Sequence, residues 1–167
     1  LQAKGIQKKY PIHIKLETGM HRLGFKENEL EELASILRKY NIKVESVFSH
    51  LSSADHPDEK EYTLHQIQTF ERLSKSFSEA LGYFPWRHIL NSSGIVNYTE
   101  YQYNMVRIGI GMVGVSSHPK IKSQLQNAVT FKTVISQISE IKEGESVGYN
   151  RKYKAPKDTR IATLPVG

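Results

Sequence analysis

The chain has 167 residues, of which 38% are hydrophobic, and its formal net charge is +6. This length and composition allow a buried core in one domain, or in one domain and part of another, and they exclude a disordered chain. The sequence contains no cysteine, which excludes disulfide bonds, thiolate zinc sites and cysteine nucleophiles. It also has no apolar run long enough to cross a bilayer and no signal-like start, so we expect a cytoplasmic protein that contacts no membrane.

Hydrophobic periodicity predicts strands that alternate with helices over the first two thirds of the chain. The expected strands cover residues 12–16, 44–49, 88–91 and 105–110. A helix is expected from a cap at Asn28, completed by Glu31, to Tyr40. A second helix is expected over residues 61–81, ended by Gly82.

This alternation favours parallel βαβ units, with the four strands as neighbours in sequence order. From Ala128 onward the residues are β-branched and polar in turn, with no helical period. The sequence therefore predicts an α/β unit over residues 1–117, a linker over residues 118–127 and the beginning of a mainly β domain over residues 128–167.

Three glycines, Gly109, Gly111 and Gly114, have the spacing of a dinucleotide-binding turn. That motif requires a following helix and an acidic residue about 20 positions later. Here Pro119 and a β-branched alternation follow, and the next acidic residue is Glu140. A nicotinamide-binding domain is therefore disfavoured, and the glycines need another explanation.

Side chains that could bind a ligand or take part in catalysis lie at or after the end of each of the four expected strands. They are Lys15, Glu17 and Arg22 after the first, His50 and Asp55 after the second, Asn91 and Ser92 after the third, and Arg107 and Gly109 on the fourth. In α/β proteins this edge of the sheet is where ligands bind, and barrels often hold phosphate after strands seven and eight. The pattern predicts a ligand site at this edge.

Five motifs, HIKLETGMHRLGF, FSHLSSAD, HILNSSG, MVRIGIGMVG and IKEGESVGYNRKYKA, resemble the PLP-dependent alanine racemases in order and spacing. The resemblance covers essentially the whole chain. It implies strands five to eight of a PLP-binding (β/α)8 barrel, followed by the start of the mainly β C-terminal domain. It also implies that the chain is a fragment, because the lysine that binds PLP covalently lies in a segment that precedes this one in the family.

The resemblance assigns the glycine-rich stretch to the phosphate of PLP. Gly109 and Ile110 would present backbone N–H groups to the phosphate, and a Cβ at the glycine would keep the phosphate away. Ser92 would donate its hydroxyl from the preceding loop, with Asn91 beside it. Without the other motifs, the Asn91 to Gly94 stretch is typical of a plain turn.

Arg107 occupies the position of the family's arginine at the pyridine nitrogen of PLP. A guanidinium can only donate hydrogen bonds, so this nitrogen would stay unprotonated and the ring would be a weaker electron sink. The alternative is a structural arginine on a strand. The resemblance also places His50 between Arg107 and a catalytic tyrosine.

Lys15 matches a lysine that is carbamylated in the family. The added carboxylate would hold Arg22 near the cofactor and the substrate carboxylate, whereas an unmodified lysine would repel it. The alternative is that Lys15 pairs with Glu17 or solvent. Relatives often have glycine where this chain has His21.

Racemisation needs two acid/base groups on opposite faces of Cα. The lysine outside this chain would serve one face, and Tyr149, by resemblance, would serve the other in the neighbouring subunit of a homodimer. A phenol is a poor base at neutral pH, so His50 would have to favour its ionised form. Gly148 and Asn150 depart from the family motif, and Tyr149 could otherwise be one of nine packed tyrosines.

The resemblance therefore implies an isomerase that interconverts L- and D-alanine with PLP and supplies D-alanine for peptidoglycan; the fragment alone is expected to be inactive. A racemase of another small amino acid such as serine is one alternative, and a non-catalytic PLP-binding or dimerisation module is another. No metal site is expected, because the carboxylates of SADHPDE are more typical of a solvated turn. His88 is expected to be a satisfied, partly buried histidine.

A single basic concentration lies in the last part of the chain. It comprises Arg151, Lys152, Lys154, Lys157 and Arg160. A nucleic-acid surface would extend such a cluster along a groove and interleave it with aromatic side chains, but only Tyr149 and Tyr153 are near. We expect no nucleic-acid partner.

Overall fold

The computed structural model describes residues 10–167, and the start of the expected first unit, residues 1–9, lies outside this description. The chain divides into two compact units, Leu1–Ala128 and Val129–Gly167. Each unit has its own sheet structure. No helix within residues 10–167 has the length and apolar character that crossing a membrane requires.

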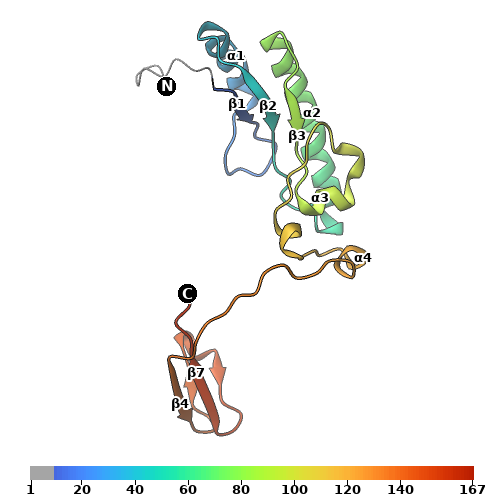
Figure 1. Ribbon diagram of the computed structural model, residues 1–167. Coiled ribbons are helices and arrows are strands. Elements are labelled where there is room, and N and C mark those ends of the chain that lie inside the picture. The colour runs from blue at the N-terminus through green and yellow to red at the C-terminus, as the bar shows by residue number, and fades with distance from the viewer. Residues whose placement is uncertain (1–9) are drawn as a thin grey trace. The chain divides into compact units, whose positions relative to one another are not determined.

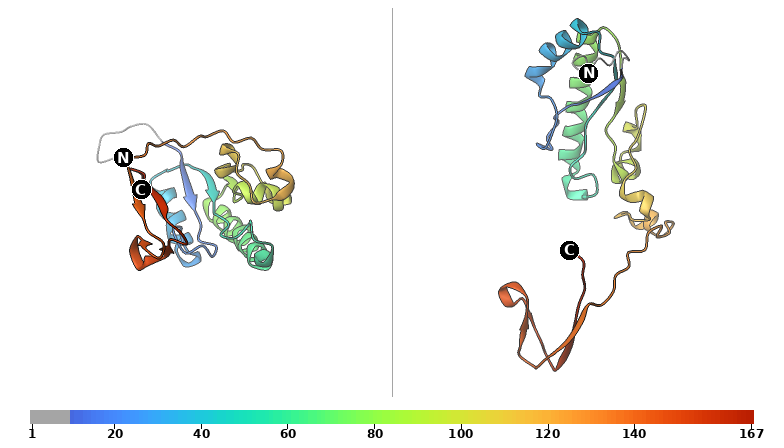
Figure 2. Two further views of the ribbon diagram at one scale, coloured as in Figure 1. Left: turned by 90° about the horizontal axis from the view of Figure 1, so that it is seen from below. Right: turned by 60° about the vertical axis from the view of Figure 1, so that its left-hand side comes forward.

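The first unit contains a parallel sheet in the predicted order, with three strands instead of the four expected. Its strands are β1 (Ile12–Lys15), β2 (Val44–Phe48) and β3 (Trp86–His88), in the order β1-β2-β3. Two helices, α1 (Leu30–Lys39) and α2 (Lys60–Leu81), cover one face of this sheet (Figures 1 and 2). Apolar side chains of the strands and helices form one core beneath the helices. The other face of the sheet carries His13, Ser46 and His88 together with the Phe48 ring.

The start of α1 differs from the expectation. A 3-10 turn, η2 (Glu27–Glu29), precedes the helix, and the capping box joins Lys26 to Glu29 instead of Asn28 to Glu31. The Glu29 side chain accepts a hydrogen bond from the Lys26 N–H at 2.7 Å. The cap lies two residues earlier because the 3-10 turn satisfies the free N–H groups before the α-helix begins.

The second helix ends where the sequence predicted. Gly82 adopts a left-handed conformation (φ 82°), and its N–H bonds to Ser78 and Glu79 carbonyls. A 3-10 turn, η3 (Pro57–Glu59), leads into this helix. The 22 residues of α2 supply much of the core, including Phe70 and Phe77.

The fourth strand, expected at residues 105–110, does not form. Two backbone bonds, Asn104 N–H to Arg87 O and Arg107 N–H to Leu90 O, run beside β3 three residues apart, not two. The Asn104 side chain takes the Arg87 N–H that a strand carbonyl would have taken. Glycine at positions 109 and 111 further weakens strand formation.

Short elements fill the rest of the first unit. They are α3 (Ser92–Asn97), η4 (Thr99–Tyr101), η5 (Ile110–Val113) and α4 (Pro119–Lys122). The glycine-rich stretch thus opens a single 3-10 turn and not the long helix of a dinucleotide-binding fold. The third glycine has a backbone reason: Gly114 has φ 85°, and a Cβ there would lie 2.1 Å from the Gln126 carbonyl oxygen.

The second unit consists of two antiparallel pairs. One pair joins β4 (Gln137–Ile141) to β7 (Thr159–Thr163), and the other joins β5 (Ser146–Val147) to β6 (Tyr153–Lys154). The 3-10 turn η6 (Tyr149–Arg151) connects the shorter pair. Residues 128–136, predicted as β structure, form no strand. Ala128 N–H bonds to the Val113 carbonyl and Ser136 N–H to the Thr163 carbonyl, but these isolated bonds form no ladder, and the apolar side chains between them are exposed.

Candidate functional site

The Arg107 side chain contacts several residues at the carboxyl end of the parallel sheet. Its Nη2 donates to the Ser49 carbonyl oxygen at 2.6 Å and lies 3.3 Å from His50 Nδ1. Its Nη1 bonds to His88 Nδ1, and its guanidinium lies 5.3 Å from the centre of the Phe48 ring. Contacts to β2, to β3 and to the residues after them fix this half-buried side chain in place.

Several positive groups face this end of the sheet. Burial lowers the pKa of His50, and the charges of Arg107, Arg22 and Lys15 lower it further. Burial also lowers the pKa of Lys15, with added repulsion from Arg22 and Arg107 and an opposing effect of Glu17. Cations held this close destabilise one another, so the site favours an anion such as a phosphate or a carboxylate.

Lys15 forms no ion pair with Glu17 among the described residues, which removes one part of the alternative stated above, that Lys15 pairs with Glu17 or with solvent. The Glu17 carboxylate accepts the Gly19 N–H at 2.5 Å and lies 4.0 Å from His21 Nδ1. Although burial raises it, the backbone N–H groups of His21 and Gly19 hold the pKa of Glu17 below its ordinary value. His21 has φ 53°, so a residue with a Cβ takes the left-handed conformation that glycine favours.

Ser92 and the glycine-rich stretch form a cradle of polar groups. The Ser92 hydroxyl accepts the N–H groups of Gly109 at 3.0 Å and Gly111 at 3.2 Å. A Cβ at Gly109 would meet nothing within 4 Å, so open space lies next to these amides. A phosphate could take that space and the hydrogen bonds that Ser92 now accepts.

Asn91 has a structural task at this cradle. Its Oδ1 accepts the Gly94 N–H at 2.9 Å and caps α3, while its Nδ2 donates to the Leu51 carbonyl at 3.2 Å. Asn91 therefore fixes the loop that presents Ser92. Ile110 follows Gly109 at the first position of η5, with its side chain exposed.

Tyr149 lies in the second unit, within η6, and 97% of its side chain is exposed. Positive φ angles flank it, at Gly148 (75°), Asn150 (59°) and Arg151 (51°). The turn therefore projects the phenol away from its own unit. Its relation to His50 stays a prediction.

His88 is buried and satisfied, with Arg107 on Nδ1 and Ser46 Oγ 2.9 Å from Nε2. Ser46 and the Ser49 carbonyl were not among the residues predicted for the site. The one available signal was a serine between Glu45 and Val47 in the strand expected at residues 44–49. Within residues 10–167, no three histidine or acidic side chains gather as metal ligands would.

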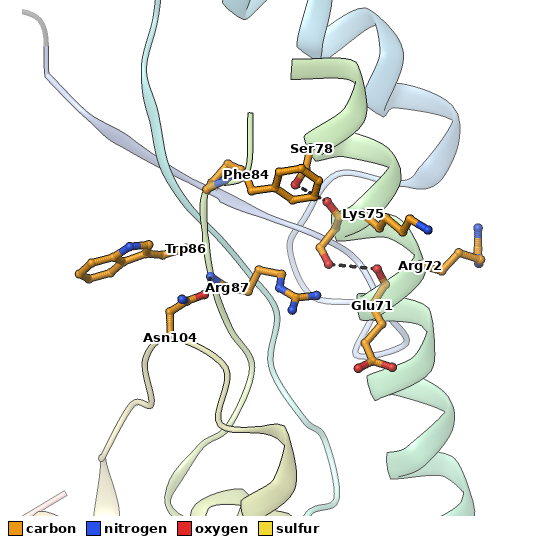
Figure 3. Close-up of a pocket in the computed structure, with 10 residues that line it drawn as sticks. Glu71, Arg72, Lys75, Ser78, Phe84, Trp86, Arg87 and Asn104 are labelled. Carbon is orange, nitrogen blue, oxygen red and sulfur yellow. Dashed lines mark hydrogen bonds between the residues drawn. The ribbon is translucent and has the colours of Figure 1, made fainter. Parts of the chain in front are cut away.

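A hollow of about 520 Å³ lies elsewhere, on the helix side of β3 (Figure 3). Glu71 and Lys75 of α2 lie on one side of it, and the Arg87 side chain of β3 extends toward them, whereas the Trp86 ring points away from the helix. None of the predicted site residues lines this hollow. The polar cluster at the end of the sheet is therefore a separate feature.

Comparisons with known proteins agree across the whole chain. The family model "Alanine racemase, N-terminal domain" matches residues 1–117, and "Alanine racemase, C-terminal domain" matches residues 128–167. The alanine racemase of Fusobacterium nucleatum is 37% identical over 159 residues, which are 93% of this chain and 43% of that protein.

Solved structures give the same result. The alanine racemase of D-cycloserine-producing Streptomyces lavendulae superposes with a TM-score of 0.72 at 26% identity, over 99% of this chain and 45% of that one. The alanine racemase of Bartonella henselae, solved with covalently bound pyridoxal phosphate, gives a TM-score of 0.61 at 26% identity, with 99% and 44% covered. The chain thus spans less than half the length of these relatives.

Proposed function

The chain belongs to the alanine racemase family, and we propose that it forms the second half of the PLP site of an enzyme that interconverts L- and D-alanine. One observation carries this proposal: Arg107 and the cradle of Ser92, Gly109 and Gly111 flank the same end of the parallel sheet. The pyridine nitrogen of PLP would accept a hydrogen bond from Arg107, and its phosphate would accept hydrogen bonds from the cradle. The strands β1, β2 and β3 would correspond to strands five to seven of the barrel, and residues 105–110, beside β3, would take the place of strand eight. Residues 118–127 would be the linker to the β domain.

The residues present fit PLP. Ser92, Gly109 and Ile110 would hold the phosphate through the hydroxyl and two N–H groups, and Asn91 would fix their loop. PLP, when bound, supplies an electron sink for the electron pair left at Cα when a proton departs. Arg107 would face the ring nitrogen, and because it can only donate, it keeps that nitrogen unprotonated and favours prompt return of a proton to Cα.

Arg22, positioned by Lys15, would lie on the side of the site that binds the substrate carboxylate. Burial, and after it the charge of Arg22, lower the pKa of Lys15, which increases the fraction in the neutral amine form. A neutral amine attacks CO2, forming an N–C bond and releasing a proton, and the product is a carbamate anion. This anion would accept hydrogen bonds from Arg22 and position it toward the substrate.

Tyr149 would exchange the second proton with Cα in the neighbouring subunit of a homodimer, with His50 beside its hydroxyl. The exposure of Tyr149 on a projecting turn supports a role outside its own unit. The first proton would be exchanged by a lysine that lies outside these 167 residues. The enzyme would work in the cytoplasm and supply D-alanine for peptidoglycan.

Mixed dimers test the subunit arrangement. A Tyr149→Phe subunit paired with a subunit that lacks the PLP-binding lysine should regain one working site, made of one chain's lysine and the other chain's tyrosine. If confirmed mixed dimers stay inactive, Tyr149 does not act across the subunit boundary.

Purified intact protein tests the function itself. We expect bound PLP, seen as absorbance in the visible range and on the order of one cofactor per chain, and conversion of L-alanine to the racemate, with slower conversion of L-serine. Arg107→Gln should greatly reduce racemisation, whereas Arg72→Gln, at an exposed pair with Glu27, should not. Absence of PLP binding in the intact protein would overturn the proposal.

A further inference from the structure

A row of polar side chains crosses the sheet on the face opposite the helices. His13 Nδ1 lies 2.6 Å from Ser46 Oγ, and Ser46 Oγ lies 2.9 Å from His88 Nε2. His88 Nδ1 bonds to Arg107 Nη1. The four residues come from all three strands and from the segment beside β3, so the row spans the whole sheet.

We propose that Ser46 and His13 are positioning residues for Arg107, which they hold through His88 by hydrogen bonds that all donate in one direction. This inference rests on the proposed role of Arg107 at the cofactor. It extends that role to two residues that touch neither cofactor nor substrate.

The direction follows from the chemistry of arginine. A guanidinium has no acceptor, so Arg107 donates and His88 Nδ1 must carry no proton. The single proton of neutral His88 is then on Nε2, which donates to Ser46 Oγ. The Ser46 hydroxyl is left to donate to His13 Nδ1. Each residue fixes the proton of the next, and the row ends at His13.

His88 is held in this state from several sides. Burial and the charge of Arg107 lower the pKa of His88 to about 4, so the ring is neutral at neutral pH. Its ring stacks on Phe48, with centroids 5.0 Å apart and planes 4° from parallel. Arg107 in turn lies over the Phe48 ring. A fixed, neutral His88 gives Arg107 one orientation.

A register shift in the sheet places Ser46 in the row. Ile12 pairs with Val44, but His13 pairs with Ser46, so Glu45 is an extra residue in β2. In a strand without this irregularity, Ser46 would share the face of Val44, two residues before it, and point into the core. The shift turns Ser46 toward His13 and His88 instead. Irregularities of this kind often redirect a side chain beside an active site.

The test begins with the cofactor-free intact protein, with histidine labelled by ¹⁵N and the His88 signals assigned by their loss in His88→Gln. We expect His88 to be protonated on Nε2 alone. In Ser46→Ala the Nε2–H loses its acceptor, and in His13→Leu the Ser46 hydroxyl is released to donate to Nε2. In both variants the population protonated on Nδ1 should rise.

PLP binding gives the second readout. Ser46→Ala and His13→Leu should each weaken PLP binding by about tenfold, the size that loss of an outer-shell partner has at metal sites. His13→Asn, whose Oδ1 can accept from Ser46, and Ser46→Thr, which keeps the hydroxyl, should restore both readouts. Ser78→Ala is the matched control, because Ser78 and Ser46 are both serines with 1% exposure and Ser78 bonds only within α2.

Two results would overturn the proposal: protonation of His88 on Nδ1 in the unmodified protein, or PLP binding by Ser46→Ala and His13→Leu no weaker than by Ser78→Ala. His13 is exposed among the described residues, so His13→Leu keeps the test available if Ser46→Ala fails to fold. If the intact protein binds no PLP at all, the proposed function fails, while the ¹⁵N signals still decide whether the row donates in one direction.

Discussion

Arg107 Nη2 lies 3.3 Å from Nδ1 of His50, so a permanent cation stands against a titratable ring. Removing that charge should raise the pKa of His50, which burial lowers first and Arg107 lowers next. Arg107→Gln in the intact apoprotein is the variant, and an NMR titration of His50 is the measurement.

The control is Arg72→Gln, which removes an exposed guanidinium paired with Glu27. It should leave the His50 titration unchanged. A His50 pKa that stays constant or falls in Arg107→Gln would mean that burial alone sets it.

The histidine beneath Arg107 predicts how stability depends on pH. His88 has a pKa of about 4 in the folded protein, against about 6.5 when unfolded. Above pH 6.5 both states are neutral, so the stability is fully present. Below pH 6.5 the unfolded state binds a proton that the folded state does not, and stability is lost until about pH 4.

His88 alone should lower the free energy of unfolding by about 2 kcal/mol when the pH falls from 7 to 5. His88→Gln should flatten the pH dependence by that amount, measured by urea unfolding of the intact apoprotein. His56→Gln, at an exposed side chain, should not flatten it. Equal slopes in the two variants would contradict the burial of a neutral His88.

Two glycines of one motif should respond oppositely to alanine. Gly114 has φ 85°, and a Cβ there would lie 2.1 Å from a backbone oxygen, so Gly114→Ala should destabilise the fold by about 1–3 kcal/mol. Gly109 has open space at that position, so Gly109→Ala should alter stability by less than about 0.5 kcal/mol.

Gly109→Ala should instead weaken PLP binding, because the added methyl group occupies the space assigned to the phosphate. Urea unfolding and PLP titration of both variants measure the contrast. Normal PLP affinity in Gly109→Ala would place the phosphate elsewhere.

The sequence predicted those parts of the fold that depend on local pattern. The end of α2 at Gly82 and the parallel order of three strands were correct, because a left-handed glycine and βαβ alternation are visible within short windows. The cap of α1 was placed too late, since Lys26 and Glu29 form it across a 3-10 turn that has no strong sequence signature. The strand at 105–110 was wrong, because the Asn104 side chain replaces a ladder bond.

The candidate site likewise contains residues that the sequence could predict and residues that it could not. Motif resemblance could propose Arg107 and Ser92, whose neighbours in sequence are distinctive. It could not find the contact of Ser46 with His13, 33 residues apart, because that contact depends on one extra residue in β2. A register shift is a property of two paired strands, and neither strand alone reveals it.

The repulsion between Lys15 and Arg22 leads to a prediction about chemical modification. With ¹³C-bicarbonate, the intact protein should show a carbamate carbon signal that disappears in Lys15→Arg, because the arginine side chain forms no stable carbamate. Lys39→Arg, on the exposed end of α1, is the control and should keep the signal. A protein without any carbamate signal that shows Lys15 and Arg22 in direct contact would contradict this role.

The most direct test of the two-base account is the exchange of the Cα proton in D2O by the intact Tyr149→Phe dimer. The account predicts normal PLP binding, loss of racemisation in both directions, and continued exchange for the one alanine enantiomer whose Cα proton faces the lysine. The other enantiomer should exchange slower by ~10²–10⁴, the usual contribution of general-base catalysis. Racemisation at the unmodified rate, or equal loss of exchange for both enantiomers with PLP still bound, would contradict it.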